Sequence, residues 1–344
     1  MFGPHIFIAV TTAISLLTTN LVYAETFCPI VTNPNEDRRQ DKNYLRIVQY
    51  NVEWLFTDYY KLADCPGDGC TWKNETAAKE HITHLSTVIN KLQPDIMNMC
   101  EVEGCDEINE VIKQTSSDYN SYLLQGSDTS TGQNVGMMTK INPSFNLYRS
   151  EERVNYPVPN SKCNYTGSPG TEGVTKHYIT GFHFADMQVL FIGLHLLAYP
   201  TDIQRCVKRE AQATVIQNVI IPYIQKGYEV IVMGDFNDFD EDPLDANNNN
   251  PISQVLDIVR GKNTKIYELY NVASEIPKVD RYTDWWDKNN DCKSTPNEFS
   301  TIDHILVTPN LKTKIKNTYI YHGYDEYCGT YNSDHYPVVL DLEL

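Results

Sequence analysis

The segment Ser333-Asp334-His335-Tyr336-Pro337-Val338, near the end of the chain, places an acid and an imidazole directly before an apolar run. Similar polar groups stand at the ends of other short apolar runs: Asn51, Glu101, Gly234-Asp235-Phe236-Asn237 and Ile302-Asp303. Because strands deliver the side chains at their ends to a common cleft, this pattern predicts one site assembled from distant parts of the chain. Carboxylates for a hard cation, amides for positioning and a histidine backed by an acid are what metal-assisted phosphoryl transfer requires.

The apolar patterning predicts more strands than helices. Short apolar runs predict strands at residues 45–50, 96–99, 134–139, 179–184, 188–196, 229–233, 302–307 and 336–342. Helical periodicity predicts helices at residues 76–92, 107–114 and 201–221. Since buried strands alternate with helices, we expect two packed sheets with helices on the outside.

The chain has 344 residues, of which 41% are hydrophobic and 21% charged, an ordinary globular composition. The motifs extend from Asn51 to His335, so neither half of the chain contains a complete site. We therefore expect residues 25–344 to form a single domain with one large core.

Residues 1–24 have the features of an export signal. Residues 7–21 are mostly apolar and uncharged, and Val22-Tyr23-Ala24 offers small residues where signal peptidase reads them. An uncleaved membrane anchor is the alternative, but the apolar run is short for a membrane span. We predict cleavage, a secreted or secretory-pathway protein, and no later transmembrane segment. The glycosylation patterns Asn74-Glu75-Thr76 and Asn164-Tyr165-Thr166 fit this route.

All nine cysteines follow the signal segment, which in an exported protein indicates disulfides. Their spacing is not that of zinc ligands. We predict the pairs Cys65–Cys70 and Cys292–Cys328, although spacing does not fix the connectivity. An odd number leaves at least one thiol unpaired within the chain, and Cys28 is our candidate for it.

The formal net charge is −17. A surface this acidic argues against a regulatory or architectural DNA-binding protein, which needs a basic surface to hold the phosphate backbone. It does not exclude a nucleic-acid substrate, because a bound cation reverses the charge locally and a degrading enzyme must release its product. We therefore expect no stable complex with nucleic acid.

Taken in order, the motifs resemble the endonuclease/exonuclease/phosphatase superfamily, with its deoxyribonuclease I-like fold. The residues that carry the resemblance are Asn51, Glu101, His195, Asp235 and Asn237 of the GDFN motif, Asp303, and Asp334-His335. The segments 131–136 and 209–212 are also similar to the superfamily. The resemblance covers most of the chain and implies a four-layered α/β sandwich, two packed mixed β-sheets flanked by helices. It further implies divalent-metal-dependent hydrolysis of a phosphoester at one edge of the sheets.

The resemblance assigns Glu101 as the main metal ligand, with Asn51 beside it and Asp334 also available to the metal. Mg²⁺ is the expected cofactor because it prefers hard oxygen ligands, and Mn²⁺ or Ca²⁺ are the alternatives. A surface role for Glu101 is disfavoured by the buried apolar strand expected before it. For Asn51 taken alone, an ordinary turn residue remains an alternative.

His335 is the predicted proton-transfer residue, because an imidazole titrates near neutral pH, and the resemblance assigns Asp303 to orient its ring. Asp235 and Asn237 alternate along an extended segment, so both are expected to point toward the attacking water and the phosphate. An Asx turn after the preceding strand is the alternative, and both can hold. His195 matches the second histidine of deoxyribonuclease I-like members and is expected to donate to the leaving group or to a phosphate oxygen.

The segment 281–286, Arg281-Tyr282-Thr283-Asp284-Trp285-Trp286, precedes Asp303. Its aromatic side chains either stack on a base and line a substrate pocket or belong to the core, and the sequence favours neither. His304 is expected to be structural, since one step along an extended strand turns it to the face opposite Asp303.

The leading hypothesis is an exported, metal-dependent phosphodiesterase, a deoxyribonuclease I-like endonuclease with nucleic acid as its substrate. The alternative is a sphingomyelinase-like phospholipase C or a phosphatase, because loops choose the substrate while strands keep the chemistry. A catalytically inactive binding module is a third hypothesis, disfavoured because none of the site residues is lost. The sequence leaves the oligomeric state open.

Overall fold

A computed structural model describes residues 27–57, 74–116, 118–128, 130–184, 186–289, 291–324 and 333–344. The expected signal segment, residues 1–24, lies outside these ranges, as do Cys65, Cys70 and Cys328. Within them, none of the helices has the length and apolar character required to cross a bilayer.

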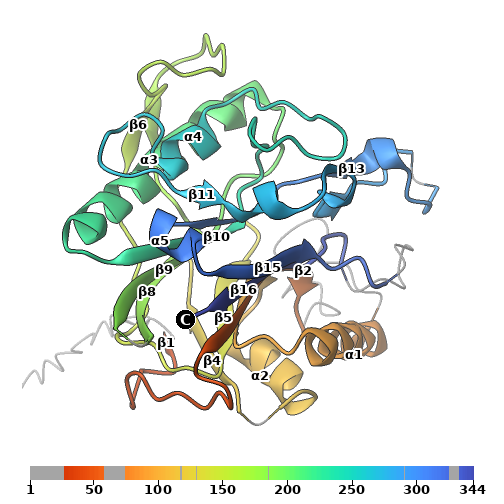
Figure 1. The fold of residues 1–344 in the computed structure, drawn as a ribbon. Helices are drawn as coiled ribbons and strands as arrows, with labels where there is room; N and C mark the ends of the chain where they lie inside the picture. Colours follow the sequence, from red (N-terminus) through yellow and green to blue (C-terminus); the bar gives the residue numbers. More distant parts are fainter. Residues whose placement is uncertain are drawn as a thin grey trace, which may run out of the picture.

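Two mixed β-sheets pack face to face (Figure 1). The seven-stranded sheet has the order β1 (Phe27–Cys28), β4 (Asn120–Leu124), β5 (Asn134–Thr139), β3 (Ile96–Val102), β2 (Tyr44–Leu55), β16 (Val338–Glu343) and β15 (Ile315–Ile320). The five-stranded sheet has the order β11 (Tyr270–Asn271), β14 (Asp303–Val307), β10 (Glu229–Asp235), β9 (Met187–His195) and β8 (His177–Phe184). Two small ribbons complete the strands: β6 (Val154–Tyr156) with β7 (Gly170–Glu172), and β12 (Asp284–Trp285) with β13 (Phe299–Ser300).

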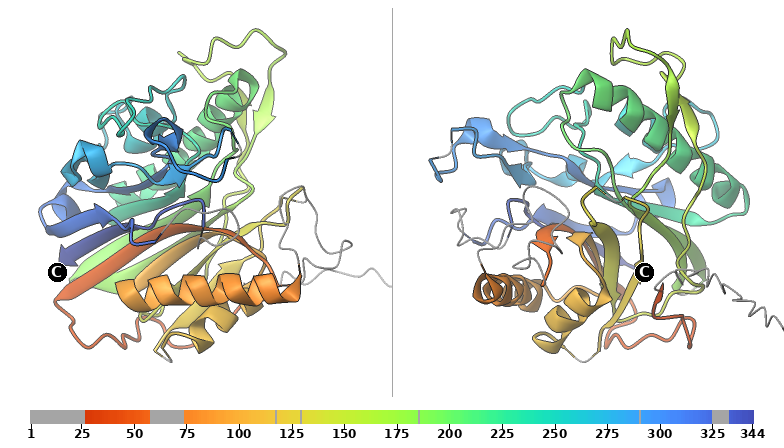
Figure 2. Two further views of the ribbon diagram at one scale, coloured as in Figure 1. Left: turned by 90° about the vertical axis from the view of Figure 1, so that its right-hand side faces the viewer. Right: turned by 180° about the vertical axis from the view of Figure 1, so that it is seen from behind.

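Helices cover the outer face of each sheet (Figure 2). Helices α3 (Ile203–Gln225) and α4 (Val255–Arg260) pack against the five-stranded sheet, and α1 (Glu75–Leu92) and α2 (Cys105–Lys113) against the seven-stranded sheet. The short elements are α5 (Pro309–Lys312), η1 (Val272–Glu275), η2 (Lys278–Asp280) and η3 (Pro296–Glu298). The four layers confirm the predicted sandwich.

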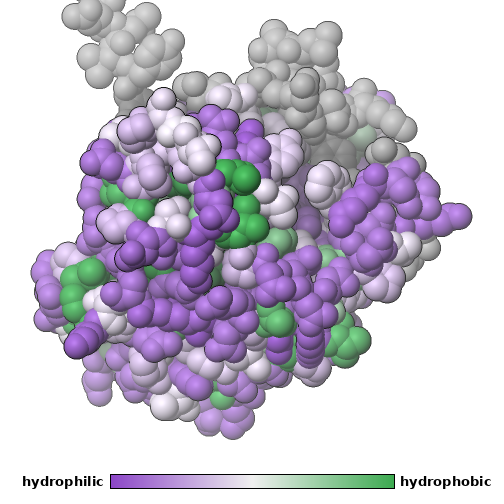
Figure 3. Space-filling view, turned by 90° about the horizontal axis from the view of Figure 1, so that it is seen from above, coloured by the Kyte–Doolittle hydropathy of each residue, from purple (hydrophilic) through white to green (hydrophobic). Residues whose placement is uncertain are grey.

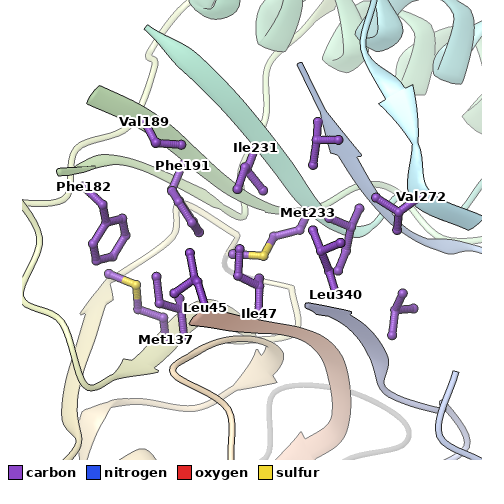
Figure 4. Close-up of a cluster of buried hydrophobic side chains, with 14 of the residues drawn as sticks. Leu45, Ile47, Met137, Phe182, Val189, Phe191, Ile231, Met233, Val272 and Leu340 are labelled. Carbon is purple, nitrogen blue, oxygen red and sulfur yellow. The ribbon is translucent and has the colours of Figure 1, made fainter. Parts of the chain in front are cut away.

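The main core fills the space between the two sheets (Figure 4). Along β2, Leu45 and Ile47 face the other sheet, whereas Val48 and Tyr50 face α1. Along β10, Ile231 and Met233 likewise belong to the core between the sheets. Because side chains alternate along a strand, this parity carries the polar residues at the strand ends into the same layer.

The predicted strands and helices are all present, with shifted boundaries. The largest shifts are in β2, which continues past the expected 45–50 to Leu55, and in α3, which extends past residue 221 to Gln225. The sequence pattern did not predict β1, β4, β11, β15, the short ribbons or the helices after α3. The strand β15 is an edge strand with Lys316 and Asn317 exposed, so its apolar signal is weak.

Two disulfides join cysteines of the described chain: Cys28–Cys105, with Cα atoms 5.9 Å apart, and Cys163–Cys206, with Cα atoms 5.7 Å apart. The expectation that Cys28 is unpaired is therefore wrong, because β1 pairs with β4 and brings Cys28 to the start of α2. Among the described cysteines, the free one is Cys100, which is buried. Both asparagines of the glycosylation patterns are exposed, and Asn74 also accepts the N-cap hydrogen bond of α1.

Candidate active site

Strands of both sheets end at one edge of the sandwich, and their last residues form the candidate site. In the five-stranded sheet, Asp235 on β10 lies in register with His195 on β9 and with Asp303 on β14. In the seven-stranded sheet, the parallel strands β2 and β3 carry Asn51 and Glu101 to the same edge. The carboxyl ends of parallel strands are the usual place for a ligand site in α/β folds.

Glu101 is directed into the site by an irregularity of β3. Its φ angle is 67°, and the pairing of β3 with β5 shifts register between Cys100 and Val102. Such bulges re-aim a side chain at the cost of a local break in the ladder. Glu101 accepts hydrogen bonds from Asn51 Nδ2 at 3.1 Å and from the Trp54 backbone N–H at 3.1 Å. Asn51 Nδ2 also donates to Asp235 Oδ2, at 3.0 Å, and so links the two sheets.

His335 and Asp303 form the buried pair that the resemblance implied. The ring Nδ1 lies 2.7 Å from Asp303 Oδ2, and Nε2 faces the site, 3.4 Å from Asn51 Nδ2. The other oxygen of Asp303 accepts a hydrogen bond from Gln49 Nε2 at 3.0 Å. The Asp303 backbone N–H donates to Thr283 Oγ1, also at 3.0 Å. The carboxylate is therefore held from several directions, which fixes the orientation of the ring.

Burial and neighbouring charges act in different directions on the pKa values of His335 and Asp235. Burial by itself lowers the pKa of His335, but Asp303, with smaller contributions from Asp334 and Asp235, raises it well above 6.5. Burial raises the pKa of Asp235 well above 3.8, and the nearby Asp303 raises it further, against the effect of His335. These shifts favour the imidazolium form of His335 and make Asp235 a stronger base than an exposed aspartate.

His195 also faces Asp235, but its pKa shifts in the opposite direction from that of His335. Its Nε2 is 3.5 Å from Asp235 Oδ2 and 4.0 Å from Glu101 Oε1. Its Nδ1 is buried and has no hydrogen-bond partner among the described residues. Burial lowers the pKa of His195 well below 6.5, with Lys176 and His335 acting in the same direction. This imidazole is therefore neutral at neutral pH, and it can still donate a hydrogen bond from Nε2.

Asn237 lies in a turn and not in the extended segment that the sequence predicted. The strand β10 ends at Asp235, and Asn237 has a φ angle of 49°, so the segment is not extended. Asp235 Oδ1 accepts the Asn237 backbone N–H at 2.8 Å, which is the alternative Asx turn. The amide of Asn237 lines the site and donates to the Leu196 carbonyl at 3.2 Å.

Asp334 lies next to His335, whereas His304 does not face the site. Asp334 Oδ1 lies 3.9 Å from His335 Nε2, and its side chain is 41% exposed. Among the described residues, Asp334 forms no hydrogen bond with Asn51. His304 faces away from the site, with Nδ1 3.1 Å from Asn271 Nδ2 and Nε2 3.0 Å from the Asp238 carbonyl.

The sequence reading did not single out Gln49 and Asp284. Strand parity was the available signal for Gln49, which lies two residues before Asn51 and so shares its face. Asp284 stood in a segment read only for its aromatic residues. A backbone bridge joins Asp284 to His335, and its Oδ1 lies 3.7 Å from His335 Nε2 while Ser300 Oγ donates to Oδ2 at 2.8 Å. Burial raises the pKa of Asp284.

The donor set fits a hard divalent cation. Glu101, Asn51 and Asp334 offer oxygens, and the carboxylates of Asp235 and Asp303 crowd the same space, where ligand atoms of Asp235, Asp303 and His335 lie within 4.8 Å of one another. Buried carboxylates repel one another unless a cation compensates them. Because Asp303 is already paired with His335, Glu101 is the better-placed carboxylate for the cation. The Oδ1 of Asn51, beside Glu101, already accepts the Glu53 backbone N–H at 3.1 Å.

Two hollows open from this centre. The aromatic hollow, of about 450 Å³, is lined by Tyr199, Phe239, Trp286 and Phe299, together with Asp235, Asp284 and His335. The basic hollow, of about 680 Å³, is lined by Lys176, Arg205 and Lys208, together with Gln133 and Gln212. Glu101, His195 and Tyr199 line both hollows. Glu101 and His195 therefore lie where the two hollows meet, whereas Asp235, Asn237 and His335 line the aromatic hollow alone.

The tryptophans of segment 281–286 divide between the two roles that the sequence left open. Trp285 is buried and its Nε1 donates to Glu298 Oε2 at 3.3 Å, so it belongs to the packing. Trp286 is 62% exposed and lines the aromatic hollow.

Solved structures share this fold. An endonuclease/exonuclease/phosphatase from Bacteroides vulgatus matches with a TM-score of 0.53 and 16% identity, over 88% of this chain and 99% of that chain. Truncated Caenorhabditis elegans TDP2 matches with a TM-score of 0.51 and 13% identity, over 88% and 98%. D. rerio TDP2 complexed with single-strand DNA product matches with a TM-score of 0.50 and 18% identity, over 88% and 99%. At these identities the likeness establishes the fold alone.

Sequence comparison gives the family. Comparison with curated protein sequences finds no match. The sequence profile of the Endonuclease/Exonuclease/phosphatase family matches residues 48–335, which is more than half of the chain and includes every residue of the site described above. The members of that family are divalent-metal-dependent phosphoester hydrolases. The protein is therefore an enzyme of the Endonuclease/Exonuclease/phosphatase family.

Proposed function

We propose that this protein is a secreted, divalent-metal-dependent phosphodiesterase that hydrolyses nucleic acid. The observation that carries the proposal is the convergence of Asn51, Glu101, Asp235 and the Asp303–His335 pair beside two hollows that share Glu101 and His195. A phosphodiester has a substituent on each side of phosphorus. Two hollows therefore suit a diester better than a monoester.

In the proposed reaction, water attacks phosphorus and the ester oxygen leaves from the opposite side. Asp235 takes the proton from the water, for which its raised pKa suits it. The His335 imidazolium, oriented by Asp303, and the neutral His195 donate hydrogen bonds to the phosphoryl and leaving oxygens. A divalent cation bound by Glu101 with Asn51 and Asp334 would stabilise the negative charge on the phosphoryl group.

The lining of the hollows favours nucleic acid over lipid. Exposed aromatic rings such as Trp286 can stack on a base, and Lys and Arg side chains can contact a phosphate backbone. On the face shown in Figure 3, hydrophobic residues lie in small groups among hydrophilic ones. An enzyme that works on a membrane surface would instead need an extended apolar face. D. rerio TDP2, which shares the fold, binds single-strand DNA product.

The proposed location rests on several features. Residues 1–24 have the composition of an export signal, and two disulfides join described cysteines. The asparagines of both glycosylation patterns are exposed. These features suit an enzyme that degrades nucleic acid outside the cytosol.

The test is nicking of supercoiled plasmid by purified residues 25–344 with Mg²⁺, with EDTA, and with the variants His335→Ala and Glu101→Gln. We expect metal-dependent nicking that each substitution lowers by about 10²–10⁴-fold, the range of a general acid–base or electrostatic group. His183→Ala, an exposed histidine on β8, is the matched control and should keep full activity.

Folded protein that fails to nick plasmid or to degrade single-stranded DNA and RNA would contradict the nuclease assignment. Turnover of sphingomyelin or of phosphomonoesters by the same protein would establish the alternative function. Nicking that survives both EDTA and His335→Ala would show that a contaminant, or a different site, is responsible.

A further inference from the structure

The two hollows differ in charge. The lining of the aromatic hollow includes the carboxylates of Glu101, Asp235, Asp284 and Glu298, against two cationic groups, Lys288 and the His335 imidazolium. The lining of the basic hollow includes three cations, against the carboxylates of Asp128 and Glu101. In a chain of net charge −17, three cations in one hollow beside the catalytic centre are a local reversal of sign.

Arg205 is the cation of the basic hollow that remains available. Lys176 Nζ lies 3.3 Å from Asp128 Oδ2, and Lys208 Nζ lies 3.6 Å from Glu172 Oε2, so both lysines are partly neutralised. In the described part of the chain, no carboxylate lies within ion-pair distance of the Arg205 guanidinium. Instead it lies over the ring of Tyr199, 4.6 Å from the ring centroid.

Tyr199, on whose ring Arg205 lies, has a backbone that is held in a fixed conformation. Its side chain is 56% exposed and lines both hollows. Its backbone φ angle of 67° is one that residues other than glycine rarely adopt. The fully buried Arg209 holds this conformation, since its Nη1 donates to the Tyr199 carbonyl at 2.9 Å and its Nη2 to the Pro200 carbonyl at 2.8 Å. Asp238 in turn pairs with Arg209 at 3.0 Å.

We propose that the basic hollow is a subsite for a second phosphate of the substrate, next to the phosphate that is hydrolysed, with Arg205 as its main ligand. A guanidinium stacked on an aromatic ring keeps its planar donors oriented, and their geometry matches two oxygens of a phosphate. Lys176 and Lys208 add attraction over a longer range. Asp284 disfavours a second anion in the aromatic hollow, so the site distinguishes the two sides of the scissile bond.

This inference rests on the proposed function and narrows the substrate class. The preferred substrate is a polyanionic phosphodiester chain that carries a further phosphate on one side of the scissile bond and an uncharged, flat group on the other. An oligonucleotide has both features. A lipid whose only phosphate is the scissile one has no group for the basic hollow.

The test compares three substrates: bis(p-nitrophenyl) phosphate, a dinucleotide with one internal phosphate, and the same dinucleotide with an added phosphate at its 5′ or its 3′ end. We expect an added phosphate at one end to raise kcat/KM about tenfold or more, the effect of a charge-assisted hydrogen bond. Arg205→Ala should remove that increment and leave hydrolysis of bis(p-nitrophenyl) phosphate within about twofold. Arg205→Lys, which keeps the charge without the planar donors, should restore only part of it.

Lys226→Ala is the matched control, because Lys226 also stacks on a tyrosine, 5.3 Å from the Tyr223 ring, at the far end of α3. Hydrolysis of all three substrates without any increment from an added phosphate would overturn the subsite and leave the proposed function intact. An Arg205→Ala loss of equal size on every substrate would also overturn it. Failure of the folded wild-type protein to hydrolyse any diester would instead reject the proposed function.

Discussion

The two histidines of the site both face Asp235 Oδ2, with Nε2 3.5 Å away for His195 and 4.0 Å away for His335, yet their charge states differ. His335 has a carboxylate 2.7 Å from Nδ1, and the pKa of this histidine is raised well above 6.5. His195 has a buried Nδ1 without a partner among the described residues, and the pKa of this histidine is lowered well below 6.5. Both imidazoles are buried, so burial cannot explain the difference. The carboxylate behind the ring decides it.

Histidines outside the site show what burial does without such a carboxylate. His81 on α1, whose Nε2 lies 2.8 Å from the Val52 carbonyl, has its pKa lowered to about 3, chiefly by burial. His177 on β8 has its pKa lowered to about 3 for the same reason. The His195 environment is therefore the ordinary result of burial. The Asp303–His335 pair is the exception, and it is the half of the site that holds a stable positive charge.

The largest expected effect comes from removing the carboxylate that distinguishes the two histidines. Asp303→Asn should lower kcat by about 10³-fold, because the ring loses both its orientation and its stabilised charge. In the metal-free protein, the His335 pKa, followed by NMR of the ring, should fall below 6.5 and so approach that of His195. A His335 pKa that stays high in this variant would mean that Asp303 is not the cause of the raised value.

A smaller loss of kcat is expected when His195, the neutral histidine, is substituted. His195→Gln keeps a hydrogen-bond donor, whereas His195→Ala removes it, so the alanine variant should lose about 10²-fold in kcat and the glutamine variant less. Steady-state kinetics on one diester substrate measure both. Equal losses in the two variants would contradict a donor role for Nε2 and point to packing. Since a neutral donor does not titrate, the pH dependence of kcat should not change.

Gln49 connects the Asp303–His335 pair to the buried layer between the sheets. Its Nε2 donates to Asp303, and its Oε1 accepts from Asn98 Nδ2. Gln49→Leu should lower kcat by about tenfold with little change in KM, and should shift the His335 pKa in the metal-free protein, because Asp303 loses one of its fixed donors. Gln49→Glu tests whether charge matters, since a second carboxylate should raise the His335 pKa further. An unchanged His335 pKa in both variants would reduce Gln49 to a packing residue.

The smallest expected effect concerns stability and pH. The folded pKa of His81 is about 3, below the unfolded value of 6.5, so the unfolded chain binds the proton more readily. The contribution of His81 is therefore complete above pH 6.5 and is lost as pH falls toward 3, at up to about 1.4 kcal/mol per pH unit. Urea unfolding between pH 7 and 5 should show a steeper decline for wild-type protein than for His81→Gln. Parallel declines would show that His81 titrates equally in both states.

The sequence by itself determined which chemical groups form the site and where along the chain they stand. Asn51, Glu101, Asp235 and Asp303 each lie at or near the end of an apolar strand, and strand periodicity fixes the face of Asn51, Asp235 and Asp303. The same periodicity placed His304 on the opposite face from Asp303, as observed. Local patterns were sufficient here because alternation along a strand depends only on neighbouring residues.

The tertiary structure alone decided the charges, the cross-links and the shape of the site. The bulge at Glu101 and the Cys28–Cys105 disulfide depend on strand pairing between distant segments. The different charge states of the two histidines depend on the carboxylate of Asp303, which lies behind the ring of His335 and has no counterpart behind His195 among the described residues. The contrast between the hollows depends on loops that the chain brings together from several elements. Distances between residues far apart in sequence set all of these properties, and no local pattern encodes them.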